Sequence, residues 1–305
     1  MNDSITIFLH RLIGRGAVVV PHLFLCGALL AMAGCATLPK SLPVEEGVAE
    51  QVRQEFTVML RDQQHCPSAL DADVSVTVDN LMWSGTLTGY LRAMAPAYLR
   101  FEGVNPLGLT EAIFAVDGKN FTYLSVRDQQ VYSGPLSADL LSRYTPDGLA
   151  TAMNYSWLLG RIPPGQVGIG EVGLDENGQE YWLDLDYAGN DQRSRILFNP
   201  AAHLIKRHLV LSMREAIDAD LVYEYPLSTT PAGSEQSTHP TKPEENGPPS
   251  PALTVGCLLP ERITMKSPGN GFLGLGFNKR YPTPKLDSAP FRITPPAEYQ
   301  RNVVQ

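Results

Sequence analysis

The sequence has little of what catalysis and metal binding require. Only 6 of its 305 residues are histidine, and it contains no Gly-x-Ser-x-Gly elbow. His203 and His208 lie an odd number of positions apart in a predicted strand, so they point to opposite faces and cannot share a metal ion. Asp184 and Asp186 share a strand face but have no convergent histidine, lysine or arginine nearby in sequence. We therefore expect no enzyme, no metal site and no cofactor.

Positive charge is also scarce. The chain has 24 lysines and arginines against 32 aspartates and glutamates, a formal net charge of −8. This balance argues against a nucleic-acid partner and against a polybasic contact with anionic lipid.

Long apolar runs are missing after the first 34 residues. That first stretch has Arg11 and Arg15 followed by an apolar core, which is typical of a secretory signal peptide. Its end, Ala33-Gly34-Cys35, resembles the lipobox of bacterial lipoproteins, in which the cysteine is diacylated and becomes the new N-terminus. The alternative is an ordinary signal peptide, or a membrane helix, with an incidental cysteine.

The residue after Cys35 indicates where such a lipoprotein would go. It is Ala36, whereas lipoproteins retained at the inner membrane usually carry aspartate there. The resemblance implies a lipid anchor on the periplasmic face of the outer membrane. We expect residues 1–34 to be the signal peptide, residues 35–43 the anchor and a short tether, and residues 44–305 a single domain.

Two cysteines, Cys66 and Cys257, remain in the predicted mature chain. An oxidising periplasm permits a disulfide between them. The alternative is a pair of buried thiols.

Hydrophobic spacing predicts one helix followed by many strands. Val44, Val48, Val52, Phe56 and Met59 recur at helical spacing, and this stripe either packs on the core or lies on a membrane surface. From Asp71 the period changes to two. The alternation predicts an antiparallel meander with a hairpin turn at residues 117–120, and further strands at 180–187, 195–198, 203–213, 221–225, 262–266, 272–279 and 291–294.

Three other segments interrupt this pattern. Residues 137–144 and 145–159 are helix candidates, whereas residues 226–252 are rich in Pro, Ser, Thr, Glu and Gly and are expected to form a disordered loop. Two Gly-x-Gly-x-x-Gly matches, starting at Gly168 and Gly269, lack the strand-then-helix context of a dinucleotide site. We interpret them as turn glycines.

Three segments, in the same order, resemble the LolB family of outer-membrane lipoprotein receptors. They are residues 99–111 (LRFEGVNPLGLTE), residues 155–163 (YSWLLGRIP) and the strand led by Leu259-Pro260. The similarity spans roughly residues 71–266. It implies a mainly β (α+β) protein of the LolA/LolB type: a curved, half-open antiparallel β-barrel with an N-terminal helix and a helical lid. The chain is longer than that family's members and carries the extra loop.

An incompletely closed barrel can enclose a ligand cavity when its own side chains do not fill it. Alternatively, the same side chains fill a packed core, and a one-residue register error would reverse their faces. The cavity candidates are Trp83, Leu87, Leu99, Phe101, Ile113, Tyr123, Met153, Trp157, Trp182, Leu183, Ile196 and Phe198.

Leu107 lies between Pro106 and Gly108 in a predicted turn. The LolB resemblance implies that this leucine protrudes and helps insert the delivered lipoprotein into the membrane, with Leu109 as a possible helper. The alternative is a leucine folded back onto the barrel rim.

The resemblance implies an outer-membrane lipoprotein that binds the acyl chains of lipidated proteins, receives them from a periplasmic LolA-like carrier and helps insert them into the outer membrane. Two alternatives stay open. One is a related protein with other lipid cargo. The other is a scaffold of an envelope assembly that recruits a partner through residues 226–252.

Overall fold

The computed structural model describes residues 38–79, 84–95, 97–136, 155–163, 165–188, 193–226, 257–267, 271–281 and 286–304. Residues from Pro39 to Gln305 belong to one compact unit. The predicted signal peptide, Cys35, the helix candidate at 137–144, most of the next one and nearly all of the 226–252 loop lie outside the described residues.

The predicted N-terminal helix is confirmed as α3 (Glu46–Gln63). Its buried stripe consists of Ala49, Val52, Phe56 and Met59, which recur at the three- and four-residue spacing of one helical face. Val48, expected in this stripe, is exposed. The stripe packs on the protein's own core rather than facing a membrane, because Phe56 meets the Phe198 ring edge-on at 5.3 Å between centroids.

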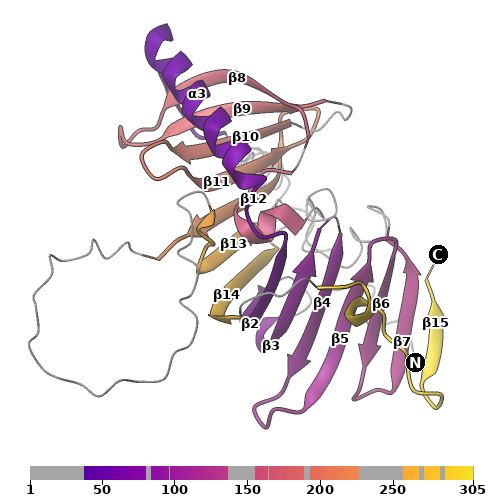
Figure 1. Cartoon of the computed structure of the whole chain (residues 1–305). Coiled ribbons are helices and arrows are strands. Elements are labelled where there is room, and N and C mark those ends of the chain that lie inside the picture. The colour runs from indigo at the N-terminus through magenta and orange to yellow at the C-terminus, as the bar shows by residue number, and fades with distance from the viewer. Residues whose placement is uncertain are drawn as a thin grey trace, which may run out of the picture. The chain divides into compact units, whose positions relative to one another are not determined.

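The described residues form one 15-stranded sheet, in the order β1-β8-β9-β10-β11-β12-β13-β14-β2-β3-β4-β5-β6-β7-β15 (Figure 1). β1 and β15 are its two edges, so the sheet is open and curved rather than a closed barrel. The strands of its first meander are β2 (Ala69–Asp79), β3 (Ser84–Met94), β4 (Tyr98–Val104), β5 (Thr110–Asp117), β6 (Asn120–Ser125) and β7 (Gln130–Pro135).

A second meander follows along the chain and joins the first where β14 pairs with β2. Its strands are β8 (Val167–Leu174), β9 (Tyr181–Tyr187), β10 (Arg193–Asn199), β11 (Leu204–Leu211), β12 (Ile217–Glu224), β13 (Arg262–Lys266) and β14 (Phe272–Arg280). The predicted antiparallel meander is thus confirmed in both parts. In Figure 1, α3 lies across the strands of this second meander.

Several local predictions were wrong. Gly168, Gly170 and Gly173 lie inside β8 rather than in a turn. The end of the predicted tether, β1 (Leu42–Pro43), pairs with β8. The strand predicted at 291–294 is absent from the described residues there: a 3-10 helix, η4 (Ala289–Phe291), precedes irregular chain.

The last strand, β15 (Gln300–Val303), also departs from the predicted pattern, because it pairs in parallel with β7. In the second helix candidate the described residues form η2, a 3-10 helix over Tyr155–Leu159.

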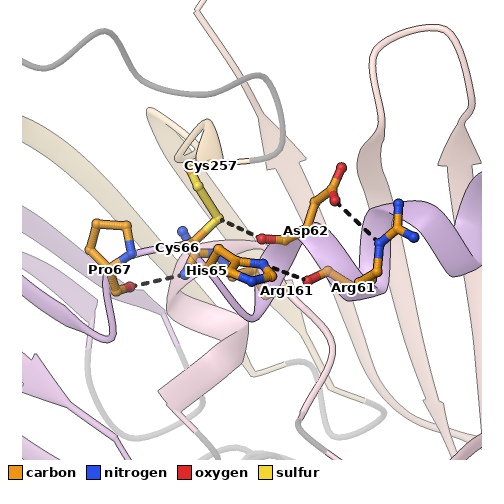
Figure 2. The surroundings of a disulfide bond; sticks show 7 residues. All are labelled: Arg61, Asp62, His65, Cys66, Pro67, Arg161 and Cys257. Atoms are coloured by element: carbon orange, nitrogen blue, oxygen red, sulfur yellow. Dashed lines mark hydrogen bonds and ion pairs between the residues drawn. A yellow bond between two sulfur atoms is a disulfide. The ribbon is translucent and has the colours of Figure 1, made fainter.

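Cys66 and Cys257 form a disulfide with a Cα–Cα distance of 5.4 Å, across a sequence separation of 191 residues (Figure 2). Cys66 follows α3 and precedes β2, whereas Cys257 precedes β13. The bond therefore joins two segments that flank the junction between the meanders.

Replacing both cysteines, Cys66→Ser with Cys257→Ser, should lower the free energy of unfolding by up to about 5 kcal/mol, because the chain-entropy model credits so long a loop with that much. Urea unfolding of the variant and of wild type measures the loss. Reduced wild-type protein is the matched control and should unfold at the same urea concentration as the variant. Equal midpoints for oxidised and reduced wild type would contradict the prediction.

Candidate functional site

One face of the sheet, here called the inner face, carries α3 and the main hydrophobic core. Register fixes which side chains share this face. Leu183 pairs with Ile196, Val76 with Leu275, and Leu91 with Phe101. Because cross-strand partners point to the same side, these pairs place both meanders' core residues on one continuous surface.

Under α3 the inner face is filled by side chains. Leu183, Leu185, Ile196 and Phe198 are completely buried there. Three of the cavity candidates, Leu183, Ile196 and Phe198, therefore belong to a packed core in this half of the sheet.

In the first meander Val116 and Phe121 form a second, smaller buried cluster on this face, but part of the face remains half-buried. Leu87, Leu99 and Phe101 are only partly covered, and Tyr123 is 38% exposed. Phe114 and Tyr132, which were not among the candidates, continue this apolar surface, since Phe114 pairs with both Phe101 and Tyr123, and Tyr132 pairs with Tyr123. In the sequence, both residues occupy alternate positions of predicted strands, as Phe101 does, and this spacing could have indicated that they share its face.

A pair of glycines shapes the centre of this surface. Gly89 and Gly103 face each other across β3 and β4. A Cβ at Gly89 would overlap the Glu102 carbonyl oxygen and come within 2.9 Å of the Phe101 ring, and a Cβ at Gly103 would overlap the Leu87 side chain. The missing side chains let Phe101 and Leu87 lie down along the sheet and broaden the apolar surface.

Two cavity candidates lie on the opposite, outer face. Ile113 pairs with Glu102, on the side where Phe291 of η4 packs against Tyr98 at 5.4 Å between ring centroids. Trp182 follows Tyr181 and precedes Leu183 in β9, so it faces away from the core. Placing these two on the inner face was wrong, because the outer face also buries apolar side chains and alternation cannot separate the two sides.

Trp182 is covered by charged residues rather than by the core. The guanidinium carbons of Arg195 and Arg207 lie 5.6 and 5.9 Å from its ring centroid. Of the remaining candidates, Trp157 in η2 is half-buried against the core, whereas Trp83 and Met153 lie outside the described residues.

The loop between β4 and β5 presents an apolar tip. Asn105 holds it, because its Oδ1 accepts hydrogen bonds from the backbone N–H groups of Leu107 and Leu109, both at 3.0 Å. Gly108 adopts φ +79° in the turn, a conformation that glycine reaches without strain. Leu107 is 84% exposed and Leu109 62% exposed. Leu107 therefore projects into solvent instead of folding back onto the sheet.

The acidic pair and the histidines have local structural partners. Asp184 and Asp186 lie opposite Arg195 and Arg193 on β10 and pair with them at 3.6 and 3.1 Å. His203 lies in the turn before β11, not within the strand, and contacts Glu55 of α3 at 3.1 Å. Among the residues that the structure describes, no three His, Cys, Asp or Glu side chains gather as metal ligands.

A polar side chain lies inside the core on the inner face. His208 is 6% exposed, and its Nε2 forms a 2.9 Å hydrogen bond with Ser194 Oγ. Its Nδ1 and the hydroxyl of Tyr223 are buried without hydrogen-bond partners. Burial lowers the pKa of His208 to about 4, so the imidazole is neutral at physiological pH.

These features define a mainly β protein with a curved, open antiparallel sheet, one face of which is filled by a helix at one end and half-buried at the other. Within the described ranges, no helix has both the length and the apolar character needed to cross a bilayer.

Neither a protein-family model nor a curated protein matches the sequence. A solved DUF1329 family protein from Desulfovibrio piger shares the fold, with a TM-score of 0.50 and 10% identity over 79% of this chain and 97% of that chain. A LolA superfamily protein from Nitrosomonas europaea matches with a TM-score of 0.48 and 11% identity over 78% and 97%. A putative outer membrane lipoprotein-sorting protein domain from Vibrio parahaemolyticus matches with a TM-score of 0.47 and 11% identity over 79% of this chain and 94% of that chain. At these identities the likeness concerns the fold alone.

Acidification should destabilise the protein through His208. Its pKa rises from about 4 in the folded state to about 6.5 on unfolding. The unfolded state therefore binds more protons between these values, and about 3 kcal/mol of stability should be lost as the pH falls through this window. Urea unfolding at a series of pH values measures the slope. His208→Gln, which removes the titration, should flatten it; an unchanged slope would contradict the assignment to His208.

Proposed function

We propose that this protein is an outer-membrane lipoprotein that binds the acyl chains of lipidated proteins and helps insert them into the outer membrane. The observation that carries the proposal is the exposure of Leu107 on a loop braced by Asn105. The resemblance of residues 99–111 to the LolB family supports the same role for this loop.

The half-buried inner face supplies a surface of the right chemistry for acyl chains. Leu87, Phe101, Phe114 and Tyr123 expose apolar area there, next to a core that α3 already fills. An acyl chain gains about 0.8 kcal/mol for each methylene that leaves water. Binding and release then depend on small differences between two apolar environments, and the proposed cycle needs no covalent chemistry.

The loop tip is suited to brief contact with lipid. Burying one leucine contributes about 1.5–3 kcal/mol, which is too little for stable anchoring. Residues 105–109 carry no charge, and the first charged side chain after them is the exposed Glu111. The tip can therefore enter the acyl boundary while Glu111 limits its depth. In the proposal, acylated Cys35 keeps the protein at the membrane, and a periplasmic LolA-like carrier supplies the cargo.

Tyr123→Glu should weaken acyl-chain binding by at least about 10-fold, because it places a charge on the apolar inner face. Displacement of a fluorescent fatty acid from the purified protein measures the effect. Tyr90→Glu is a matched control: Tyr90 is 51% exposed on β3 but points to the outer face, so binding should be unchanged. Equal losses in the two variants would rule out the inner face as the binding surface.

Leu107→Glu should leave acyl-chain binding and stability unchanged but slow delivery of a lipidated protein to phosphatidylethanolamine–phosphatidylglycerol vesicles. The free energy of burying one leucine corresponds to about a 10- to 100-fold slower delivery. Met213→Glu is the control, since Met213 is 78% exposed on a different turn and should not affect delivery. Normal delivery by Leu107→Glu would remove the main support for the proposal.

A further inference from the structure

A pocket of about 260 Å³ lies where α3 ends, between the disulfide, η2 and the start of β8. Its walls are largely apolar: Leu60, Leu159, Ile162 and Val167 contribute to them. Six polar side chains also line the pocket: Gln63, Gln64, Ser68, Tyr155, Ser156 and Arg161. Of these, Tyr155, Ser156 and Arg161 are more than nine-tenths buried, at 7%, 7% and 8% exposure.

Arg161 reaches this position because of the glycine before it. Gly160 directly follows η2 with φ +63°, and a Cβ there would overlap the Tyr225 hydroxyl. The backbone N–H of Arg161 then donates to the Ser156 carbonyl oxygen at 3.0 Å. The turn folds the chain back on η2, so that Arg161 and Tyr155 line one pocket.

The guanidinium of Arg161 is only partly satisfied. Its Nη1 donates to the Pro67 carbonyl oxygen at 3.0 Å, as Figure 2 shows beside the disulfide. Its Nε has no hydrogen-bond partner, and no described carboxylate pairs with it. Asp62, the acidic residue in that view, is directed to Arg61 instead. Burial lowers the pKa of Arg161, which reflects the cost of holding a cation away from water.

Tyr155 provides a second unused donor. Its hydroxyl is buried without a hydrogen-bond partner. Burial raises the pKa of Tyr155 to about 12, so the group keeps its proton at neutral pH. A buried guanidinium with an unpartnered N–H and a neutral hydroxyl thus line a pocket that also has apolar walls. Together they match an amphiphile with an anionic end.

We propose that Arg161 and Tyr155 bind the anionic headgroup, a carboxylate or phosphate, of an acyl lipid whose first methylenes lie against Leu60, Leu159, Ile162 and Val167. The acyl part of this ligand rests on the proposed function. The anion contact rests on the pocket itself. A guanidinium fork binds either anion with two parallel hydrogen bonds, so the two headgroups are distinguished by experiment.

The test compares three lipids that share an oleoyl chain and differ in headgroup and charge, together with inorganic phosphate as an anion without a chain. Oleate, oleoyl lysophosphatidylglycerol, uncharged monoolein and inorganic phosphate are titrated calorimetrically into the purified wild-type protein. At least one of the two anionic lipids should bind about 10- to 100-fold more tightly than monoolein, which is the range expected for a charge-assisted hydrogen bond. The tighter of the two identifies the headgroup.

Variants then assign the preference to named groups. Arg161→Met should remove the preference for the anionic lipid. Its affinity for that lipid should fall about 10- to 100-fold, whereas its affinity for monoolein should not change. Tyr155→Phe should weaken binding of the anionic lipid several-fold. Arg161→Lys should keep part of the preference that Arg161→Met loses. Arg127→Met, which removes an exposed arginine elsewhere, is the matched control and should behave as wild type. Thermal unfolding should show Arg161→Met at least as stable as wild type, because replacing a buried charge with an apolar side chain is often neutral or stabilising.

The contrary outcomes separate the two proposals. If monoolein and both anionic lipids bind equally and Arg161→Met changes none of them, the headgroup site is overturned while the acyl-carrier function stands. Equal weakening of all three lipids by Arg161→Met, with a lower melting temperature, would show a structural role only. If no lipid binds but inorganic phosphate does, and Arg161→Met abolishes it, the pocket is a small-anion site and the acyl-carrier function fails.

Discussion

The pairing of β14 with β2 is the contact on which the rest of the sheet depends. It joins the first strand of one meander to the last strand of the other, which are far apart in the sequence, and its register keeps Val74 opposite Phe277 and Val76 opposite Leu275. The inner face therefore passes from one meander to the other without changing side. Such a non-local contact must overcome the entropy of closing a long loop. The Cys66–Cys257 disulfide closes nearly the same loop covalently, since its cysteines lie just before β2 and just before β13. It therefore supports a strand pair that local sequence alone cannot specify.

Packing divides the continuous inner face into two regions with different chemistry. Under α3, Phe56 and Phe198 are completely buried and leave no room for a ligand. In the first meander, Gly89 and Gly103 lower the surface so that Phe101 and Leu87 lie along it, and the apolar side chains stay half-buried. The C-terminal segment covers the other side of these strands, with Phe291 packed on Tyr98 and the Pro290 carbonyl accepting from Arg100. The inner face of these strands is therefore the side that keeps exposed apolar area for a ligand.

Sequence periodicity located the strands better than it assigned their faces. The helix at 46–63, the hairpin at Asp117–Asn120 and most strands follow from local spacing and turn chemistry, which act over a few residues. Strand β8 was missed because its glycines are typical of turns, and polar β15 forms only by pairing with a distant edge. Ile113 and Trp182 were assigned to the wrong side because their outer-face neighbours, Phe291 and the arginines over Trp182, come from elsewhere in the chain. The exposed tip at Leu107, in contrast, depends on five adjacent residues and could be anticipated.

Several buried polar groups lack hydrogen-bond partners, which costs stability, and core packing alone does not explain why they are present. Most buried polar groups in proteins are hydrogen-bonded, and each one left unpaired costs about 1–3 kcal/mol. Here the unpaired atoms include Arg161 Nε and the Tyr155 hydroxyl, which belong to two residues that line one pocket, and His208 Nδ1 inside the core. A protein selected only for stability would replace a buried guanidinium that lacks a carboxylate partner and is only partly hydrogen-bonded with an apolar side chain. Retaining Arg161 beside Tyr155 is consistent with a partner that arrives from outside, and the apolar walls around them favour a partner that carries both an anion and a hydrocarbon chain.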